Sequence, residues 1–412
     1  MTQTTRLASG LTVVTEPVPG AQTVALGVFV GAATRDETPD EHGLAHFLEH
    51  MAFKGTRTRS AFDTVADIEA RGGDINAETS PDTTSYTVRM LAEDWRIGLD
   101  VLLDIVCEPV FRADDIAVEQ DVVVQEIAGS MDVPDDLLVD GLGLAAFPDH
   151  AMGHPILGSE ASVRAIDARA LTSFRARTYA PSATIISAAG AIEHQALIAA
   201  LEEIDPQFPG HQPQTRATPL FAAGQFREER DSYDTHLALC WSAPAFGAED
   251  AIPHALAIQM LGGGMTSRLF QAIREEEGLA YAVDAYQMTY GDCGLGVIQT
   301  ATSADKVGAM VERLNTELAR FPGSLTLDEL ASAKRQFRAS IAMAQESIPA
   351  MAARNARHIA MLGSVKPRQD LEQEIEAVSL EEVRAVWSHH MTGTNFAKAA
   401  VGPGSALDLW LV

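Results

Sequence analysis

The chain has 412 residues, of which 46% are hydrophobic and 21% charged, a balance typical of a soluble globular protein with a large core. Its 57 acidic and 30 basic residues give a formal net charge of −27, which argues against nucleic acid or an anionic membrane as partners. The three cysteines, Cys107, Cys240 and Cys293, are far apart and predict neither a disulfide framework nor a thiolate metal site. The first ten residues lack an apolar signal segment and no apolar run could cross a bilayer, so we expect a cytoplasmic protein.

The first half of the chain predicts alternating strands and helices. Strands are expected where β-branched and apolar residues alternate or cluster between turns, and helices where capping residues precede amphipathic runs. The expected strands are residues 11–15, 23–30, 74–79, 83–90 and 184–188, and the expected helices are residues 60–72, 94–106, 113–130, 135–146 and 167–177.

The second half repeats the pattern of the first half. Similar strand openings at Thr23 and Thr235 are 212 residues apart, and so are Gly190 and Gly402, which each end a helix–strand segment. A proline-rich stretch separates the two halves. We therefore predict the α+β class with two duplicated domains, each an antiparallel-rich sheet flanked by helices. The predicted boundaries are residues 1–207 for the first domain, 208–224 for the linker and 225–412 for the second.

The segment with the clearest chemistry is His46-Phe-Leu-Glu-His50, an H-x-x-E-H motif. On a helix, His46 and His50 lie one turn apart on one face, so both imidazoles could bind one zinc ion. Glu49 would then lie beside the ion, where its carboxylate could contact a metal-bound water. An ordinary solvated helix face is the alternative, but this register is uncommon by chance. The second half offers only His254 at the equivalent position, so we expect one metal site per chain.

A catalytic zinc site needs a third protein ligand, and acidic residues of the helix at 113–130 are candidates. Glu126 could complete the site, and Glu119, two turns earlier on nearly the same face, could orient a ligand or the water. Spacing alone does not single out Glu126 among 57 acidic residues.

A resemblance to a known family strengthens that choice. The segment HFLEHMAFKGT (residues 46–56) resembles the active-site segment of the pitrilysin family of zinc peptidases, closest to its mitochondrial-processing-peptidase-like branch. The family's third ligand is a Glu in a V-x-x-E-I context about 76 residues after the second His, which matches Glu126. The family's assisting catalytic Glu, seven residues earlier, matches Glu119. An Arg that often follows it in the family is replaced here by Gln120.

The resemblance also implies where a peptide binds. Asn76 and Ala77 match the family's edge strand, which pairs with the substrate backbone. Arg274 and Tyr281 match an Arg/Tyr pair that holds the substrate main chain and the reacting carbonyl. From the residues alone, these four would be an ordinary strand, a surface Arg and a packed Tyr.

The family's activity implies a zinc endopeptidase that acts on short or unfolded peptides, with Glu49 as the general base. In that family each two-domain chain forms half of a clam-shell chamber. We expect a homodimer, with a heterodimer as the alternative, and the net charge favours cationic peptides as substrates. Two other functions stay open: a non-catalytic structural or binding subunit, and a zinc hydrolase that acts on non-peptide amides.

Overall fold

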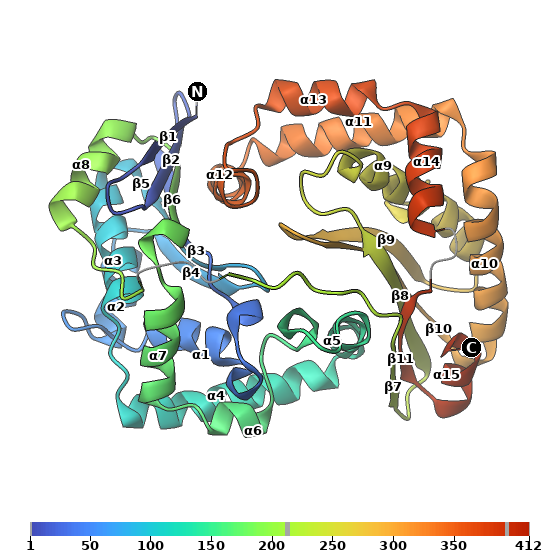
Figure 1. Ribbon diagram of the computed structural model, residues 1–412, viewed down its shortest axis with the longest axis horizontal. Helices are drawn as coiled ribbons and strands as arrows, with labels where there is room; N and C mark the ends of the chain where they lie inside the picture. The colour runs from blue at the N-terminus through green and yellow to red at the C-terminus, as the bar shows by residue number, and fades with distance from the viewer. Residues whose placement is uncertain (1, 211–214, 392–394, 412) are drawn as a thin grey trace. The chain divides into compact units, whose positions relative to one another are not determined.

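The computed structural model describes residues 2–210, 215–391 and 395–411, and the chain divides into two compact units (Figure 1). Unit 1 comprises Met1–Ala128, Pro155–Ala217 and Ala342–Val365. Unit 2 comprises Gly129–His154, Thr218–Ile341 and Lys366–Val412. Each unit has its own sheet and its own hydrophobic core.

Unit 1 is built on a six-stranded sheet in which only one pair of neighbours, β2 and β6, is parallel. Strands β1 and β4 form its two edges. In sheet order the strands are β1 (Gln3–Arg6), β2 (Thr12–Pro17), β6 (Thr184–Gly190), β3 (Thr23–Val30), β5 (Thr84–Leu91) and β4 (Asp74–Thr79).

Both faces of this sheet are covered by helices. Successive side chains of β3 point to opposite faces and so contact different helices. Val24, Leu26 and Val28 point to one face and join the main core together with α3. Ala25 points to the other face, where Met351 of α12 packs against it. The helices of unit 1 are α1 (Leu44–Ala52), α2 (Ala61–Glu69), α3 (Trp95–Cys107), most of α4 (Ala113–Asp132), α6 (Glu160–Arg164), α7 (Ala168–Thr178), α8 (His194–Ile204) and α12 (Ile348–Leu362).

Unit 2 repeats this topology on a five-stranded sheet. Its order is β7 (Gln225–Glu229), β11 (Ala397–Gly402), β8 (Asp234–Ala243), β10 (Gly294–Ser303) and β9 (Ala282–Thr289), which reproduces β2-β6-β3-β5-β4 of unit 1. The β7/β11 pair is parallel, like β2/β6, and the other pairs are antiparallel. The predicted α+β class with two helix-flanked, largely antiparallel sheets is therefore confirmed.

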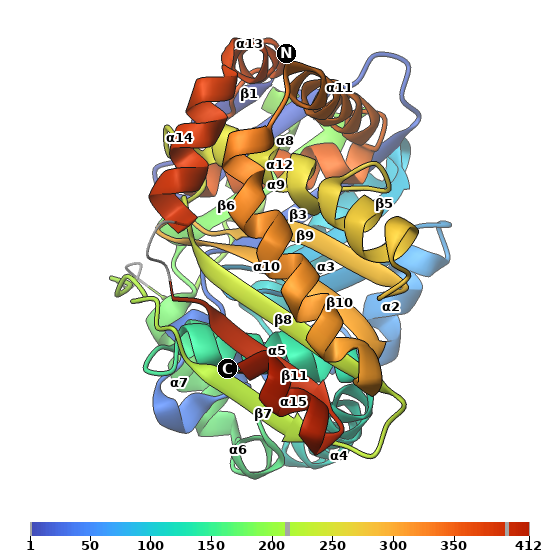
Figure 2. The ribbon, with the colours of Figure 1, turned by 90° about the vertical axis from the view of Figure 1, so that its right-hand side faces the viewer.

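The helices of unit 2 also lie on both faces of its sheet. Figure 2 shows α10 and α15 over one face, and the core on this side includes Leu237 and Trp241 of β8. The opposite face, with Ala238 and Cys240, packs against α5. The remaining helices are α5 (Pro134–Ala146), α9 (Ala251–Gly262), α10 (Val307–Ser324), most of α11 (Leu327–Ala344), α13 (Arg368–Ala377), α14 (Leu380–Met391) and α15 (Gly404–Leu411), together with a π-helix, η6 (Phe270–Glu276).

The units differ from the predicted domains in two helices. Helix α5 lies within predicted domain 1–207 but covers the sheet of unit 2, whereas α12 lies within predicted domain 225–412 but covers the sheet of unit 1. Each sheet has two apolar faces, and the exchanged helix buries one of them. The chain otherwise passes from unit 1 to unit 2 between Ala217 and Thr218, inside the predicted linker 208–224.

Among the described residues, no helix combines the length and the apolar character that crossing a membrane requires.

The packing of α5 on the second sheet can be tested at Gly141. A Cβ atom at this position would lie 2.1 Å from Cδ1 of the Phe226 ring on β7. We expect Gly141→Ala to lower the free energy of unfolding by about 1–3 kcal/mol, measured by urea denaturation. Gly129→Ala on α4 is the control, because a Cβ there meets nothing within 4 Å. It should stabilise the protein by about 0.5–1 kcal/mol, and equal effects of the two substitutions would contradict the packing argument.

Candidate metal centre and active site

Helix α1 presents the H-x-x-E-H motif because its apolar residues face the core. It begins after Gly43, whose φ of 86° favours glycine, and a Cβ there would lie 2.6 Å from the Leu157 carbonyl oxygen. Phe47, Leu48 and Met51 are completely or almost completely buried in unit 1. The histidines and Glu49 consequently project from the remaining surface of the helix.

His46, His50 and Glu126 come together, as the sequence predicts. Their ligand atoms all lie within 4.8 Å of one another. Glu126 Oε2 is 3.8 Å from His46 Nε2 and 3.6 Å from His50 Nε2. In the described part of the chain, no other set of three His, Cys, Asp or Glu residues converges in this way.

The geometry of this cluster fits a zinc ion. Two ligands of a tetrahedral zinc ion lie roughly 3.4 Å apart when each bond is about 2.1 Å long. The Glu126 distances to both imidazoles are close to this value, and two imidazoles with one carboxylate form a common ligand set of catalytic zinc. The three residues could therefore hold a zinc ion.

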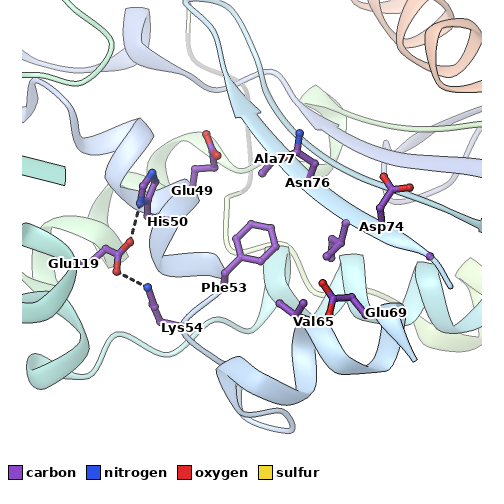
Figure 3. A pocket seen from close by; sticks show the side chains of 12 residues that line it. Glu49, His50, Phe53, Lys54, Val65, Glu69, Asp74, Asn76, Ala77 and Glu119 are labelled. Carbon is purple, nitrogen blue, oxygen red and sulfur yellow. Dashed lines mark hydrogen bonds and ion pairs between the residues drawn. The ribbon is translucent and has the colours of Figure 1, made fainter. Parts of the chain in front are cut away.

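Glu119 fixes the orientation of His50. The Nδ1 atom of His50 lies 2.7 Å from Glu119 Oε1, and the other oxygen of Glu119 pairs with the Lys54 ammonium (Figure 3). Because Nδ1 donates to the carboxylate, Nε2 carries the lone pair that faces Glu126. Burial raises the pKa of Glu119, but the hydrogen bonds from His50 and Lys54 outweigh it and keep this pKa below its usual value. Glu119 is therefore a positioning residue for His50.

The two histidines differ electrostatically. His46 is only 7% exposed, and burial, assisted by the neighbouring His50, lowers its pKa to about 4. Burial also acts on His50, but its hydrogen bond to Glu119 and the surrounding carboxylates raise its pKa overall. His46 is accordingly neutral near pH 7, the state in which imidazole binds a metal.

Glu49 is held between the metal cluster and the sheet edge. The Thr79 hydroxyl, at the end of β4, donates to Glu49 Oε2 over 2.5 Å. Burial raises the pKa of Glu49; the Thr79 hydrogen bond and His50 oppose this, while Glu126 and Glu78 add to it. Sequence reasoning did not assign a role to Thr79.

Strand β4 has the features expected of a peptide-binding edge. Among the described strands it pairs only with β5, with Asn76 opposite Thr87 and Ala77 opposite Tyr86. A cleft of about 360 Å³ runs along it, lined by Glu49, His50, Phe53, Lys54, Val65, Glu69, Gly73, Asp74, Ile75, Asn76, Ala77 and Glu119 (Figure 3). The structure thus brings Asn76 and Ala77 next to the candidate base.

Arg274 and Tyr281 lie in unit 2, and the structure brings them into contact with each other. The guanidinium of Arg274, on the π-helix η6, stacks over the rings of Phe270 (4.6 Å) and Tyr281 (4.9 Å). Tyr281 is 83% exposed. A π-helix is rare and frequently occurs at functional sites. The role of this pair on a substrate stays a prediction.

Glu37 anchors the beginning of α1, a contact that the local sequence pattern did not predict. Its buried carboxylate accepts hydrogen bonds from the backbone N–H groups of Gly43 (3.1 Å) and Ala45 (2.7 Å). It therefore caps a helix whose own N-cap, Gly43, has no side chain to do so. Because His46 Nδ1 has no hydrogen-bond partner in the described structure, the backbone anchor is important for placing this ring.

The equivalent helix of unit 2, α9, carries no such cluster. His254 is fully buried and accepts a hydrogen bond from Trp241 Nε1 over 3.2 Å, while its Nδ1 lies 3.1 Å from Gln287 Oε1. It is a core histidine with both ring nitrogens engaged. One metal-ligand group is found among the described residues, and one site per chain stays a prediction.

The fold and the site together define a two-unit α+β protein with a His/His/Glu cluster in its first half that could hold a metal ion. Residues 12–160 match the family model described as insulinase (peptidase family M16), and residues 165–337 match that of the peptidase M16 inactive domain. The chain belongs to this peptidase family, which confirms the resemblance to pitrilysin-type zinc peptidases. The finer assignment to the processing-peptidase-like branch stays a prediction.

Individual relatives are similar over nearly their whole length. The uncharacterized zinc protease YmxG of Bacillus subtilis is 32% identical, covering 96% of this chain and 97% of its own. An uncharacterized zinc protease of Mycobacterium tuberculosis is 34% identical, and the match covers 97% of this chain and 92% of that protein. Two crystal structures share the fold at 20% identity: a peptidase M16 inactive domain from Pseudomonas fluorescens (TM-score 0.91, 98% of both chains) and a protease from Helicobacter pylori (TM-score 0.90, 98% of this chain and 99% of that one).

The anchoring of α1 by Glu37 predicts a pH-dependent stability. Burial raises the pKa of Glu37 from 4.5 to about 8, although the N–H groups of Ala45 and Gly43 oppose this. The folded protein thus binds this proton more tightly than the unfolded chain, so the free energy of unfolding falls as the pH rises from 4.5 to about 8. In Glu37→Gln this contribution, at most roughly 1.4 kcal/mol per pH unit, should be absent.

Urea denaturation at pH 5.5 and pH 8 in the presence of a chelator measures the effect without a contribution from metal binding. Glu202→Gln, which removes an exposed carboxylate on α8, is the matched control and should keep the wild-type pH dependence. A Glu37→Gln protein with the same pH dependence as wild type would contradict the assignment.

Proposed function

We propose that the protein is a zinc-dependent endopeptidase that hydrolyses short or unfolded peptides. The observation that carries this proposal is the convergence of His46, His50 and Glu126 beside Glu49, which the Thr79 hydroxyl holds at the edge of the sheet. The names of the relatives as zinc proteases support the choice of metal and the class of reaction.

His46, His50 and Glu126 would hold the zinc ion, and Glu119 would keep His50 in the tautomer that binds it. Zinc, when bound, supplies a Lewis acid that polarises the scissile carbonyl and activates a water molecule. Glu49 acts as the general base. Its Oε2 accepts a hydrogen bond from the Thr79 hydroxyl, which leaves Oε1 for the water. Oε1 would take the proton of the attacking water and later deliver it to the leaving amine.

The peptide would bind by adding a strand to the free edge of β4. In the segment of Asn76 and Ala77, the backbone groups that point away from β5 would bond to the main chain of the substrate and place the scissile bond beside Glu49. This mode of binding requires an extended segment, so it selects short or unfolded peptides rather than folded proteins.

Arg274 and Tyr281 would stabilise the developing oxyanion and the peptide backbone. Stacking of Arg274 between Phe270 and Tyr281 supports this role, because it orders the guanidinium before a substrate arrives. We propose that the chain works as a homodimer, since one chain carries both the metal cluster and this pair. A heterodimer, in which a second protein supplies one of them, is the alternative.

A cleavage assay on a mixed peptide library, with and without chelator, tests the proposal directly. Chelator-sensitive cleavage is the expected result. A non-catalytic subunit would cleave nothing under either condition, and a hydrolase of non-peptide amides would leave the peptides intact but act on small amides.

The role of Glu49 predicts a separation of activity from metal content. Glu49→Gln should lower kcat at least about a hundredfold, because the amide cannot accept the proton, while elemental analysis should still find about one zinc per chain. Glu93→Gln, which alters an exposed carboxylate of unit 1, is the control and should keep wild-type kcat. Near-normal peptide hydrolysis by Glu49→Gln would refute the proposed base.

The role of Glu119 predicts an effect on zinc affinity. Glu119→Ala removes the acceptor that orients His50 and should weaken zinc binding roughly 10- to 100-fold, measured by competition with a chromophoric chelator. Glu119→Gln keeps an oxygen that can accept from His50 Nδ1 and should lose less. His50→Ala, which removes a ligand, sets the upper limit of the loss. Unchanged affinity in Glu119→Ala would show that packing alone orients the imidazole.

A further inference from the structure

The cleft beside the metal centre extends past the catalytic groups. Its wall from Glu49 and His50 of α1 continues over Phe53 and reaches Val65 and Glu69 of α2 (Figure 3). Ile75 of β4 completes this apolar part, since the odd-numbered residues of the strand are turned toward the interior and are less exposed than their neighbours. A substrate strand on β4 would therefore place one side chain in this space.

Among the residues that the structure describes, some charged side chains that line the cleft form ion pairs and others do not. Its one ammonium group, that of Lys54, pairs with Glu119. Glu69, in contrast, has no ion pair in the described structure, and its carboxylate lies beside Val65 at the far end of the cleft from Glu49 (Figure 3). The space thus combines the apolar side chains of Phe53, Val65 and Ile75 with the exposed carboxylate of Glu69 at its end.

We propose that this cleft binds a lysine or arginine side chain of the substrate next to the cleaved bond, and that Glu69 is the residue that selects it. This inference rests on the proposed peptidase function and adds a specificity to it. The methylene groups of the basic side chain pack on Phe53, Val65 and Ile75, and its cationic end pairs with Glu69. An acidic side chain would be repelled by Glu69, and an uncharged side chain of equal length would leave this carboxylate unpaired.

Asp74 provides a matched control within the same cleft. It borders the cleft, but its carboxylate points away from α2, on the other side of the strand from Glu69 (Figure 3). Replacing either acid by its amide changes the net charge equally. Only the Glu69 substitution removes the charge that faces the apolar walls.

The test uses the full-length protein with its zinc and a set of quenched fluorescent peptides of one common sequence. Lysine, norleucine or glutamate is placed at each position around the cleaved bond, which mass spectrometry locates. At one position next to this bond, wild type should cleave the lysine peptide about three- to tenfold better in kcat/KM than the norleucine peptide, which has the same length without the charge. This ratio should fall as the salt concentration rises.

The variants then identify the residue responsible. In Glu69→Gln the ratio should approach one, in Glu69→Lys the glutamate peptide should become the better substrate, and in Asp74→Asn the ratio should stay at the wild-type value. A wild-type enzyme that cleaves the norleucine peptide as well as the lysine peptide, or a lysine preference that survives in Glu69→Gln, would overturn the assignment. Chelator-sensitive cleavage without any lysine preference would overturn this inference alone, whereas no cleavage of any peptide would overturn the peptidase function and this inference with it.

Discussion

The candidate metal centre depends on two linked contacts: a hydrogen bond from His50 Nδ1 to the carboxylate of Glu119, and an ion pair from that carboxylate to the ammonium of Lys54. These contacts link two helices, because His50 lies on α1 while Glu119 and the proposed third ligand, Glu126, lie two turns apart on α4. The hydrogen bond to Glu119 also sets the tautomer of His50. Burying the Glu119 carboxylate without one of these partners would lower the free energy of unfolding by several kcal/mol, so both His50 and Lys54 are needed.

Around the His50–Glu119–Lys54 contacts, the protein buries further polar side chains. Apolar side chains at these positions would stabilise the fold more. His46 is held neutral by burial, Glu37 is buried before the start of α1, and Glu49 is half-buried beside Thr79. The apolar face of α1, with Phe47 and Met51, compensates by packing into the core of unit 1. The hydrogen bonds and the packing therefore hold these polar side chains in place without a bound ligand, as the proposed metal binding and catalysis would require.

The duplicated fold uses its two copies differently. In unit 2 the helix that corresponds to α1 keeps one histidine, and His254 serves there as a hydrogen-bonding core residue between Trp241 and Gln287. Each copy nevertheless needs a helix from the other half of the sequence, because α5 and α12 each cover the second face of the opposite sheet. Neither half of the chain contains everything required to bury its own sheet.

The sequence by itself determined the elements and the chemistry that depend on short spacings. Residue patterns and capping signals predicted α4, β4 and β5, and on a helix the four-residue step from His46 to His50 predicted their convergence, because both follow from the local geometry of a helix or strand. Glu126 could be chosen among many acids only through the family resemblance. Only the tertiary structure decided the Lys54–Glu119 pair, the Glu37 anchor, the exchange of α5 and α12 and the placement of Glu69 in the cleft. These contacts join residues whose separation along the chain follows no period, so they are fixed by how the elements pack.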